Sequence, residues 1–160
     1  VERNGVGKYD IKNVVAADEW AENVDNNAFT NAAAKSNLQF AKIKEKEDLV
    51  SELLFLYNVN SNLISDFEEK VLRLNDLRKA NHEVFLSRVK DPNIKVRAFI
   101  KELLEYNIIR REGNSYFYLD MMMGDSEQSV IGFMKNEKFN AEVTAMKQKL
   151  IAEKQNKIVG

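Results

Sequence analysis

The stretch NIIRREGNSYFYL, residues 107–119, is the most strand-like part of a chain whose other apolar residues mostly follow helical spacing. Ile108 and Ile109 are β-branched, residues 112–115 supply turn chemistry, and residues 116–119 form an aromatic run. The stretch therefore predicts a β-hairpin. Such a hairpin is either a wing that contacts nucleic acid or the lid of a small helical core, and we favour the lid.

Helices are predicted on both sides of this hairpin. Before it, Asp91 can cap a helix that has Pro92 in its first turn. After it, Asp125 or Ser126 can cap one helix and Asn136 another. The order helix, strand, turn, strand predicts a winged-helix-like C-terminal half.

The rest of the chain divides into a polar N-terminal part and a helical part. Apolar residues recur at helical spacing over residues 32–57 and again over about 63–90, with a polar break at 58–62. The predicted fold is mainly α, a helical bundle with a small β-hairpin and an extended N-terminal arm. We assign residues 1–40 to the arm and 41–160 to a single helical domain with the hairpin at 107–120.

The predicted arm is rich in asparagine and poor in large apolar side chains, so it cannot bury enough surface to order itself alone. Trp20, Val24 and Phe29 are its scattered apolar anchors. We interpret these three residues as a partner-binding set that holds the arm against neighbouring protein. The chain starts at Val1, which we interpret as a processed or truncated start.

Composition excludes several classes of site. The 160 residues carry 24 Lys and Arg against 25 Asp and Glu, a net charge of −1, so no overall field attracts nucleic acid or anionic lipid. There is no cysteine, which suits a reducing compartment or a virion interior, and His82 is the single histidine. No stretch is apolar enough to span a membrane. We therefore predict no metal site, no cofactor, no catalytic residues and no enzyme activity.

Basic residues nevertheless outnumber acidic ones between residues 73 and 111. If the hairpin is a wing, arginines would pair with phosphates and tyrosines would stack on bases. The alternative nucleic-acid-binding set is Lys95, Arg97, Lys101, Arg110, Arg111, Tyr116 and Tyr118.

Residues 100–150 resemble the C-terminal accessory domain of RecA-type recombinases, in which a helix, a short aromatic hairpin, a glycine-containing turn and a terminal helix pair follow in that order. The matching positions are Ile108, Ile109, Gly113, Tyr116, Tyr118, Gly124, Phe133 and Met134. No ATPase core accompanies them, so the resemblance implies nucleic-acid contact and no ATPase activity.

Together these observations favour a non-enzymatic structural or assembly subunit, which binds other subunits of a homo- or hetero-oligomer through its arm. A phage virion component is one class that the Lys- and Asn-rich composition suits. The alternative is a winged-helix-type nucleic-acid-binding accessory protein.

Overall fold

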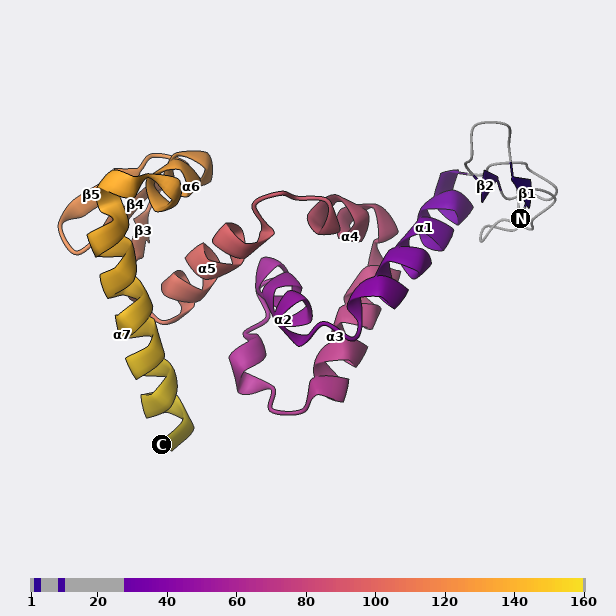
Figure 1. Cartoon of the computed structure of the whole chain (residues 1–160), viewed down its shortest axis with the longest axis horizontal. Helices are drawn as coiled ribbons and strands as arrows, with labels where there is room; N and C mark the ends of the chain where they lie inside the picture. Colours follow the sequence, from indigo (N-terminus) through magenta and orange to yellow (C-terminus); the bar gives the residue numbers. More distant parts are fainter. Residues whose placement is uncertain (1, 4–8, 11–27, 160) are drawn as a thin grey trace.

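The computed structural model describes residues 2–3, 9–10 and 28–159, and side chains from residue 31 to residue 156. Two short strands, β1 (Glu2–Arg3) and β2 (Tyr9–Asp10), pair antiparallel. Helices form most of the remainder, and a three-stranded sheet lies in the C-terminal half (Figure 1). The prediction of a mainly α protein with a small β element is confirmed.

The first four long helices are shorter than the sequence predicted, because polar residues interrupt them. A turn at residues 44–46 divides the segment predicted as helical over 32–57 into two helices. Asp66 caps the third helix by accepting from Glu68 N at 3.1 Å, and Asn81 ends that helix and caps the next through Val84 N at 3.0 Å. The elements are α1 (Ala28–Ile43), α2 (Glu47–Leu56), the short 3₁₀ helix η1 (Ser61–Leu63), α3 (Phe67–Ala80) and α4 (His82–Val89).

These helices bury a first core, which is built on α2. Its members are Ile43, Val50, Leu53, Leu54, Leu74 and Phe85. Phe40 of α1 packs edge-on against Phe85, with 6.4 Å between ring centroids. The core therefore joins all four helices.

α5 (Ile94–Glu105) connects the first core to the second half of the molecule, and Figure 1 shows it between the two groups of elements. Ile94 at its start packs against the first core, whereas Ile100 and Leu103 belong to a second core. Asp91 accepts from Asn93 N at 2.8 Å in a turn before the helix, so the helix begins two residues later than Pro92.

The predicted hairpin is present and belongs to a larger sheet. β3 (Arg110–Glu112), β4 (Ser115–Tyr118) and β5 (Met121–Gly124) are antiparallel in that order. Gly113 turns the hairpin at φ 61°, a left-handed conformation that suits glycine. The sequence did not predict β5, whose residues Met121–Gly124 follow the predicted hairpin. Met123 is buried, whereas Met122 is exposed.

The C-terminal helices α6 (Glu127–Lys135) and α7 (Asn140–Val159), with the 3₁₀ helix η2 (Glu137–Phe139) between them, cover the second core. Ser126 and Asn136 cap α6 and η2 as predicted. The second core comprises Ile100, Leu103, Tyr106, Ile109, Tyr116, Tyr118, Met123, Val130, Ile131, Phe133, Val143, Met146 and Leu150.

The structure does not confirm the extended N-terminal arm. α1 begins at Ala28, so the last part of the range predicted as an arm is helical. Trp20 and Val24 lie outside the described residues, and Phe29 is described only through its backbone in α1. Within the described ranges, no helix is both long and apolar enough to cross a membrane.

A polar cavity between the two cores as candidate functional site

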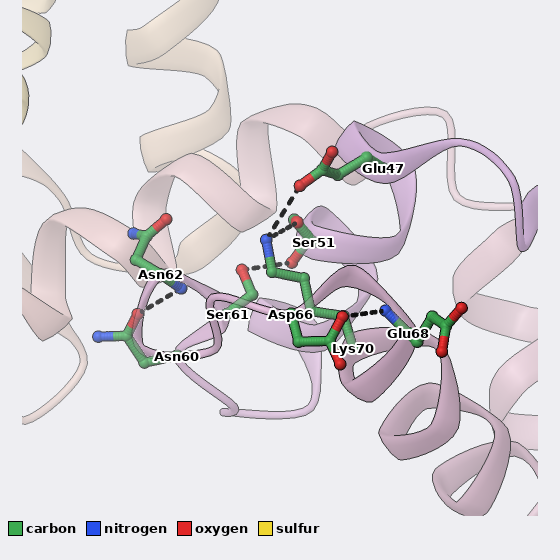
Figure 2. Close-up of polar contacts among 8 residues, drawn as sticks. All are labelled: Glu47, Ser51, Asn60, Ser61, Asn62, Asp66, Glu68 and Lys70. Atoms are coloured by element: carbon green, nitrogen blue, oxygen red, sulfur yellow. Dashed lines mark hydrogen bonds and ion pairs between the residues drawn. The ribbon is translucent and has the colours of Figure 1, made fainter.

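The loop after α2 forms one side of a polar cavity. Asn58 has φ 59°, which turns the chain sharply away from α2. Asn60 then caps η1 by accepting from Asn62 N at 3.1 Å. Ser61 is fully buried and donates to the backbone oxygen of Ser51 at 3.3 Å, which ties η1 to α2 (Figure 2). Short polar side chains therefore fix this loop by local hydrogen bonds.

α3 contributes Lys70 to the same side of the cavity. Its ammonium lies 3.4 Å from Glu47 Oε1 and 3.4 Å from Ser51 Oγ. Figure 2 shows both contacts as dashed lines. The Lys70 side chain is largely buried while Glu47 is exposed. The ion pair therefore lies at the cavity rim, where solvent screening keeps its contribution to stability small.

α5 and α7 form the opposite wall. Glu102 of α5 accepts from Asn62 Nδ2 at 2.5 Å and forms an ion pair with Lys154 of α7. Side chains from η1, α5 and α7 thus meet at one carboxylate. The cavity between these walls measures about 430 Å³, within the size range of small-molecule sites. A neighbouring hollow of about 380 Å³ shares Ser61, Asn62, Lys70 and Lys154 with it.

Glu52 is the residue of the cavity whose carboxylate has the fewest hydrogen-bond partners. Its Oε2 is buried and has no hydrogen-bond partner among the described residues. Burial raises the pKa of this carboxyl group above its usual 4.5; nearby Lys95 opposes the rise and Asp48 adds to it.

Hydroxyl, amide, carboxylate and ammonium groups therefore line this cavity, together with the half-buried ring of Phe99. In the described part of the chain, no group of three or more histidine, cysteine or acidic residues could hold a metal ion. The arrangement suits recognition of a small polar molecule by hydrogen bonds.

A separate polar cluster lies within the first core. The Arg78 guanidinium is buried between α1 and α3, where it donates to Ser36 Oγ at 3.0 Å, to Asn37 Oδ1, and to Asn75 Oδ1 at 2.7 Å. His82 Nδ1 lies 2.6 Å from Ser36 Oγ. Burial lowers the pKa of His82 below 6.5, and the Arg78 charge lowers it further. Ser36 and Arg78 are both buried, so this network helps to hold α1 against α3 and α4.

The residues predicted to bind nucleic acid lie on α5 and on the three-stranded sheet. Lys95 and Lys101 lie along α5, and Lys101 donates to Asn58 Oδ1 at 3.1 Å. Arg97 pairs with Asp91 at 2.6 Å and with Glu127 at 3.0 Å.

The hairpin residues of that set are engaged within the sheet. Arg110 pairs with Glu112 at 2.8 Å, and Arg111 donates to the Gly113 carbonyl at 2.8 Å. Tyr116 and Tyr118 are buried in the second core, where they present no free face for a base.

The sequence did not single out the residues of the cavity. Asn62 lies in the polar break that the sequence showed at residues 58–62, and Glu52, Glu102 and Lys154 belong to no motif. They come from α2, α5 and α7, and only the fold brings them together.

Comparison with known proteins decides the family. Residues 1–90, more than half of the chain, match the family described as the glycosyl hydrolase family 65 central catalytic domain. The chain belongs to glycosyl hydrolase family 65. The family match ends at the residue that caps the end of α4, so it covers α1 to α4 and excludes α5 and the second core.

Three relatives of this family 65 chain are kojibiose-processing enzymes. A kojibiose hydrolase of Mucilaginibacter mallensis is 74% identical over 46 residues, which are 29% of this chain and 7% of that protein. A kojibiose hydrolase of Flavobacterium johnsoniae is 71% identical over 41 residues, 26% of this chain and 6% of that protein. A kojibiose phosphorylase of Halothermothrix orenii is 29% identical over 98 residues, 56% of this chain and 11% of that protein. The chain thus matches only a small part of each relative's length. No solved structure matches it.

These findings overturn the functional interpretation of the sequence. The assembly-subunit and virion hypotheses are wrong, as is the prediction that the protein is not an enzyme, because the chain belongs to a family of glycosyl hydrolases. The nucleic-acid-binding alternative is wrong for the same reason.

The resemblance to RecA-type recombinases is also wrong. Local geometry explains two of its matching positions: Gly113 turns a hairpin, and a Cβ on Gly124 would lie 2.6 Å from Ser129 Cβ. Any chain with this turn and this packing needs small residues there, so these glycines do not identify a family.

Proposed function

We propose that this chain forms part of the catalytic domain of an enzyme that cleaves kojibiose. The observation that carries the proposal is the match of residues 1–90 to the central catalytic domain of family 65. The two relatives above 70% identity are kojibiose hydrolases, which supports kojibiose as the substrate and water as the acceptor.

Glycoside cleavage generally requires a pair of carboxyl groups on opposite sides of the scissile bond. The acidic residues of the family-matched range are therefore the candidates for this pair. Within its described part, Glu47, Asp48 and Glu52 lie on one helix beside the polar cavity. Their position supports a saccharide-handling role for this region without assigning the acid or the nucleophile.

Phosphorolysis is the second candidate reaction, and one observation favours it. The relative aligned over the longest part of the chain, 98 residues, is a kojibiose phosphorylase. Its identity of 29% is far below that of the two hydrolases, so hydrolysis is the primary proposal.

The chain matches only a small part of each relative, so the proposal is best tested by exchanging the matching segment within a complete relative. The 46 aligned residues of the Mucilaginibacter mallensis hydrolase would be replaced by those of this chain, and kojibiose cleavage measured with and without phosphate. We expect free monosaccharides in both conditions. A sugar phosphate formed only with phosphate would favour phosphorolysis, and a folded chimera that leaves kojibiose intact would overturn the proposal.

The control for this exchange carries the same segment with its aspartates and glutamates replaced one at a time by asparagine and glutamine. If the segment supplies a catalytic carboxyl group, one of these amide variants should lose activity while remaining folded.

Two earlier predictions stay proposals beside this function. The order of α5, β3, β4 and β5 supports a winged-helix-like description of the second half as a matter of fold. Association with other subunits also stays a prediction, which analytical ultracentrifugation of the purified protein would test.

A further inference from the structure

The polar cavity described above lies where the family-matched part of the chain meets the part beyond it. Glu52, Asn62 and Lys70 belong to residues 1–90, whereas Lys95, Glu102 and Lys154 lie after the matched range. A ligand in this cavity would therefore contact both parts of the chain. The family match alone assigns nothing to α5 or α7.

Two carboxylates of the cavity already have partners within the chain. Glu102 is shared by Asn62 and Lys154, and Glu47 faces Lys70. Glu52 Oε2 is buried without a hydrogen-bond partner in the described part of the chain. The Glu52 carboxylate lines the cavity together with Lys95, whose charge opposes the rise of its pKa. A ligand hydroxyl can donate to a carboxylate and accept from an ammonium group.

The charges of the cavity select an uncharged ligand. Four carboxylates, those of Glu47, Asp48, Glu52 and Glu102, lie among three lysines, and two of these lysines already form ion pairs. A phosphate group would face the carboxylates, and no group of ligands for a metal ion exists among the described residues. Hydroxyl groups can both donate to carboxylates and accept from ammonium groups, so they fit this mixture.

We propose that the cavity is a saccharide-binding site, in which a sugar hydroxyl donates to Glu52 and neighbouring hydroxyls interact with Lys95 and Asn62. The half-buried ring of Phe99 supplies an apolar wall for the C–H face of the sugar. The ligand class rests on the proposed function, whereas the location rests on the cavity and its polar lining. α5 and α7 thereby add saccharide contacts that lie outside the family-matched range.

The test is a titration of the purified ¹⁵N-labelled chain with kojibiose, monitored by the shifts of backbone amide signals. We expect saturable shifts concentrated in residues 47–62 and 95–102. Glu52→Gln should weaken binding by about tenfold, since the sugar hydroxyl would then donate to a neutral amide oxygen in place of a charged carboxylate. Glu69→Gln is the matched control, because Glu69 is an exposed carboxylate whose partner is Arg73 on the surface of α3.

A stability measurement separates a binding role of Glu52 from a structural role. Burial raises the pKa of Glu52, so the ionised form disfavours the folded state at neutral pH. Glu52→Gln should therefore keep or slightly raise the melting temperature at pH 7 while it weakens kojibiose binding. A large fall in melting temperature would mean that Glu52 is structural and would overturn the proposal.

The remaining outcomes distinguish this site from the proposed function. Kojibiose shifts confined to other residues and unchanged by Glu52→Gln would overturn the cavity site and leave the proposed function standing. Displacement of kojibiose by inorganic phosphate alone would identify an anion site and would also overturn the proposal. Amide shifts in the residues that line the cavity, together with a folded chimera that does not cleave kojibiose, would support the binding site and overturn the proposed function.

Discussion

The first and second cores differ in the polarity of what they bury. Every buried polar or charged residue of the described chain, namely Ser36, Ser61 and Arg78, lies in the part that matches family 65. The second core combines helices with a sheet, and its buried members are apolar or aromatic. The family-matched region thus depends on a specific polar network, whereas the region beyond it depends on apolar packing.

α5 links these two kinds of packing, since its start contacts the first core and its middle belongs to the second. Unfolding of the whole helix would therefore expose apolar surface of both cores. We therefore expect the described parts to unfold together in one cooperative transition.

The largest expected effect comes from removing the ring at the centre of the first core. Phe85 is fully buried, so Phe85→Ala should lower the free energy of unfolding by about 3–5 kcal/mol. Met146→Ala, also at a fully buried position but in the second core, should cost about 2–5 kcal/mol. Urea unfolding followed by circular dichroism would measure both.

Both substitutions should move the same single transition. Two resolved unfolding transitions, each shifted by only one of the substitutions, would show that the two cores unfold independently and would contradict this expectation. Lys42→Ala, at an exposed position of α1, is the control and should change stability by less than about 0.5 kcal/mol.

The next largest effect tests the polar network of the first core. Arg78→Ala removes a buried guanidinium and leaves Ser36, Asn37 and Asn75 without their donor. We expect a loss of about 2–3 kcal/mol in the free energy of unfolding, measured by urea titration. Arg73→Ala on the same helix removes only an exposed ion pair with Glu69 and should cost less than about 0.5 kcal/mol. Equal losses would mean that the network does not stabilise the first core.

Two glycines of the second half test its close packing. A Cβ on Gly124 would meet Ser129 Cβ at 2.6 Å, so Gly124→Ala should destabilise the protein by about 1–3 kcal/mol. Gly132 lies within α6 with open space around it, and Gly132→Ala should stabilise by about 0.5–1 kcal/mol. Thermal unfolding of the two variants would then shift in opposite directions, and shifts of the same sign would contradict the packing described here.

The smallest expected effect is a pH dependence of stability that arises from His82, beside the first core. The pKa of His82 is lowered in the folded state by burial and by the facing Arg78 charge, so the unfolded chain binds the proton more readily. Its contribution to stability is present above pH 6.5 and is lost as the pH falls through the lower folded pKa. His82→Asn should therefore reduce the loss of stability between pH 7.5 and pH 5.5, measured by urea unfolding. An identical loss in the wild type and the variant would exclude this role.

The same contrast between the cores explains which features the sequence could predict. In the second half, caps such as Ser126 and Asn136 and the Gly113 turn act through local hydrogen bonds and backbone preferences, so pattern reasoning located them. β5 was missed, because Met121 to Met123 have no clear alternation and their strand is defined by pairing with β4.

In the first half, contacts between residues that are distant in the chain determine more of the structure than local signals do. Buried Arg78 and Ser36 look like surface residues in the sequence, and no periodicity marks them as interior. The cavity could not be predicted from the sequence for a related reason. Glu52, Glu102 and Lys154 are far apart in the chain and come together only when α2, α5 and α7 pack. The family was missed because its match covers the polar segment interpreted as an arm.

Calorimetric titration of kojibiose into the purified chain tests the central claim, saccharide recognition by a family 65 chain, most directly. The account predicts saturable binding at one site and no comparable heat from glycerol, which carries hydroxyl groups without a sugar ring. The absence of saturable heat up to the solubility limit of kojibiose, with a protein shown to be folded, would contradict it.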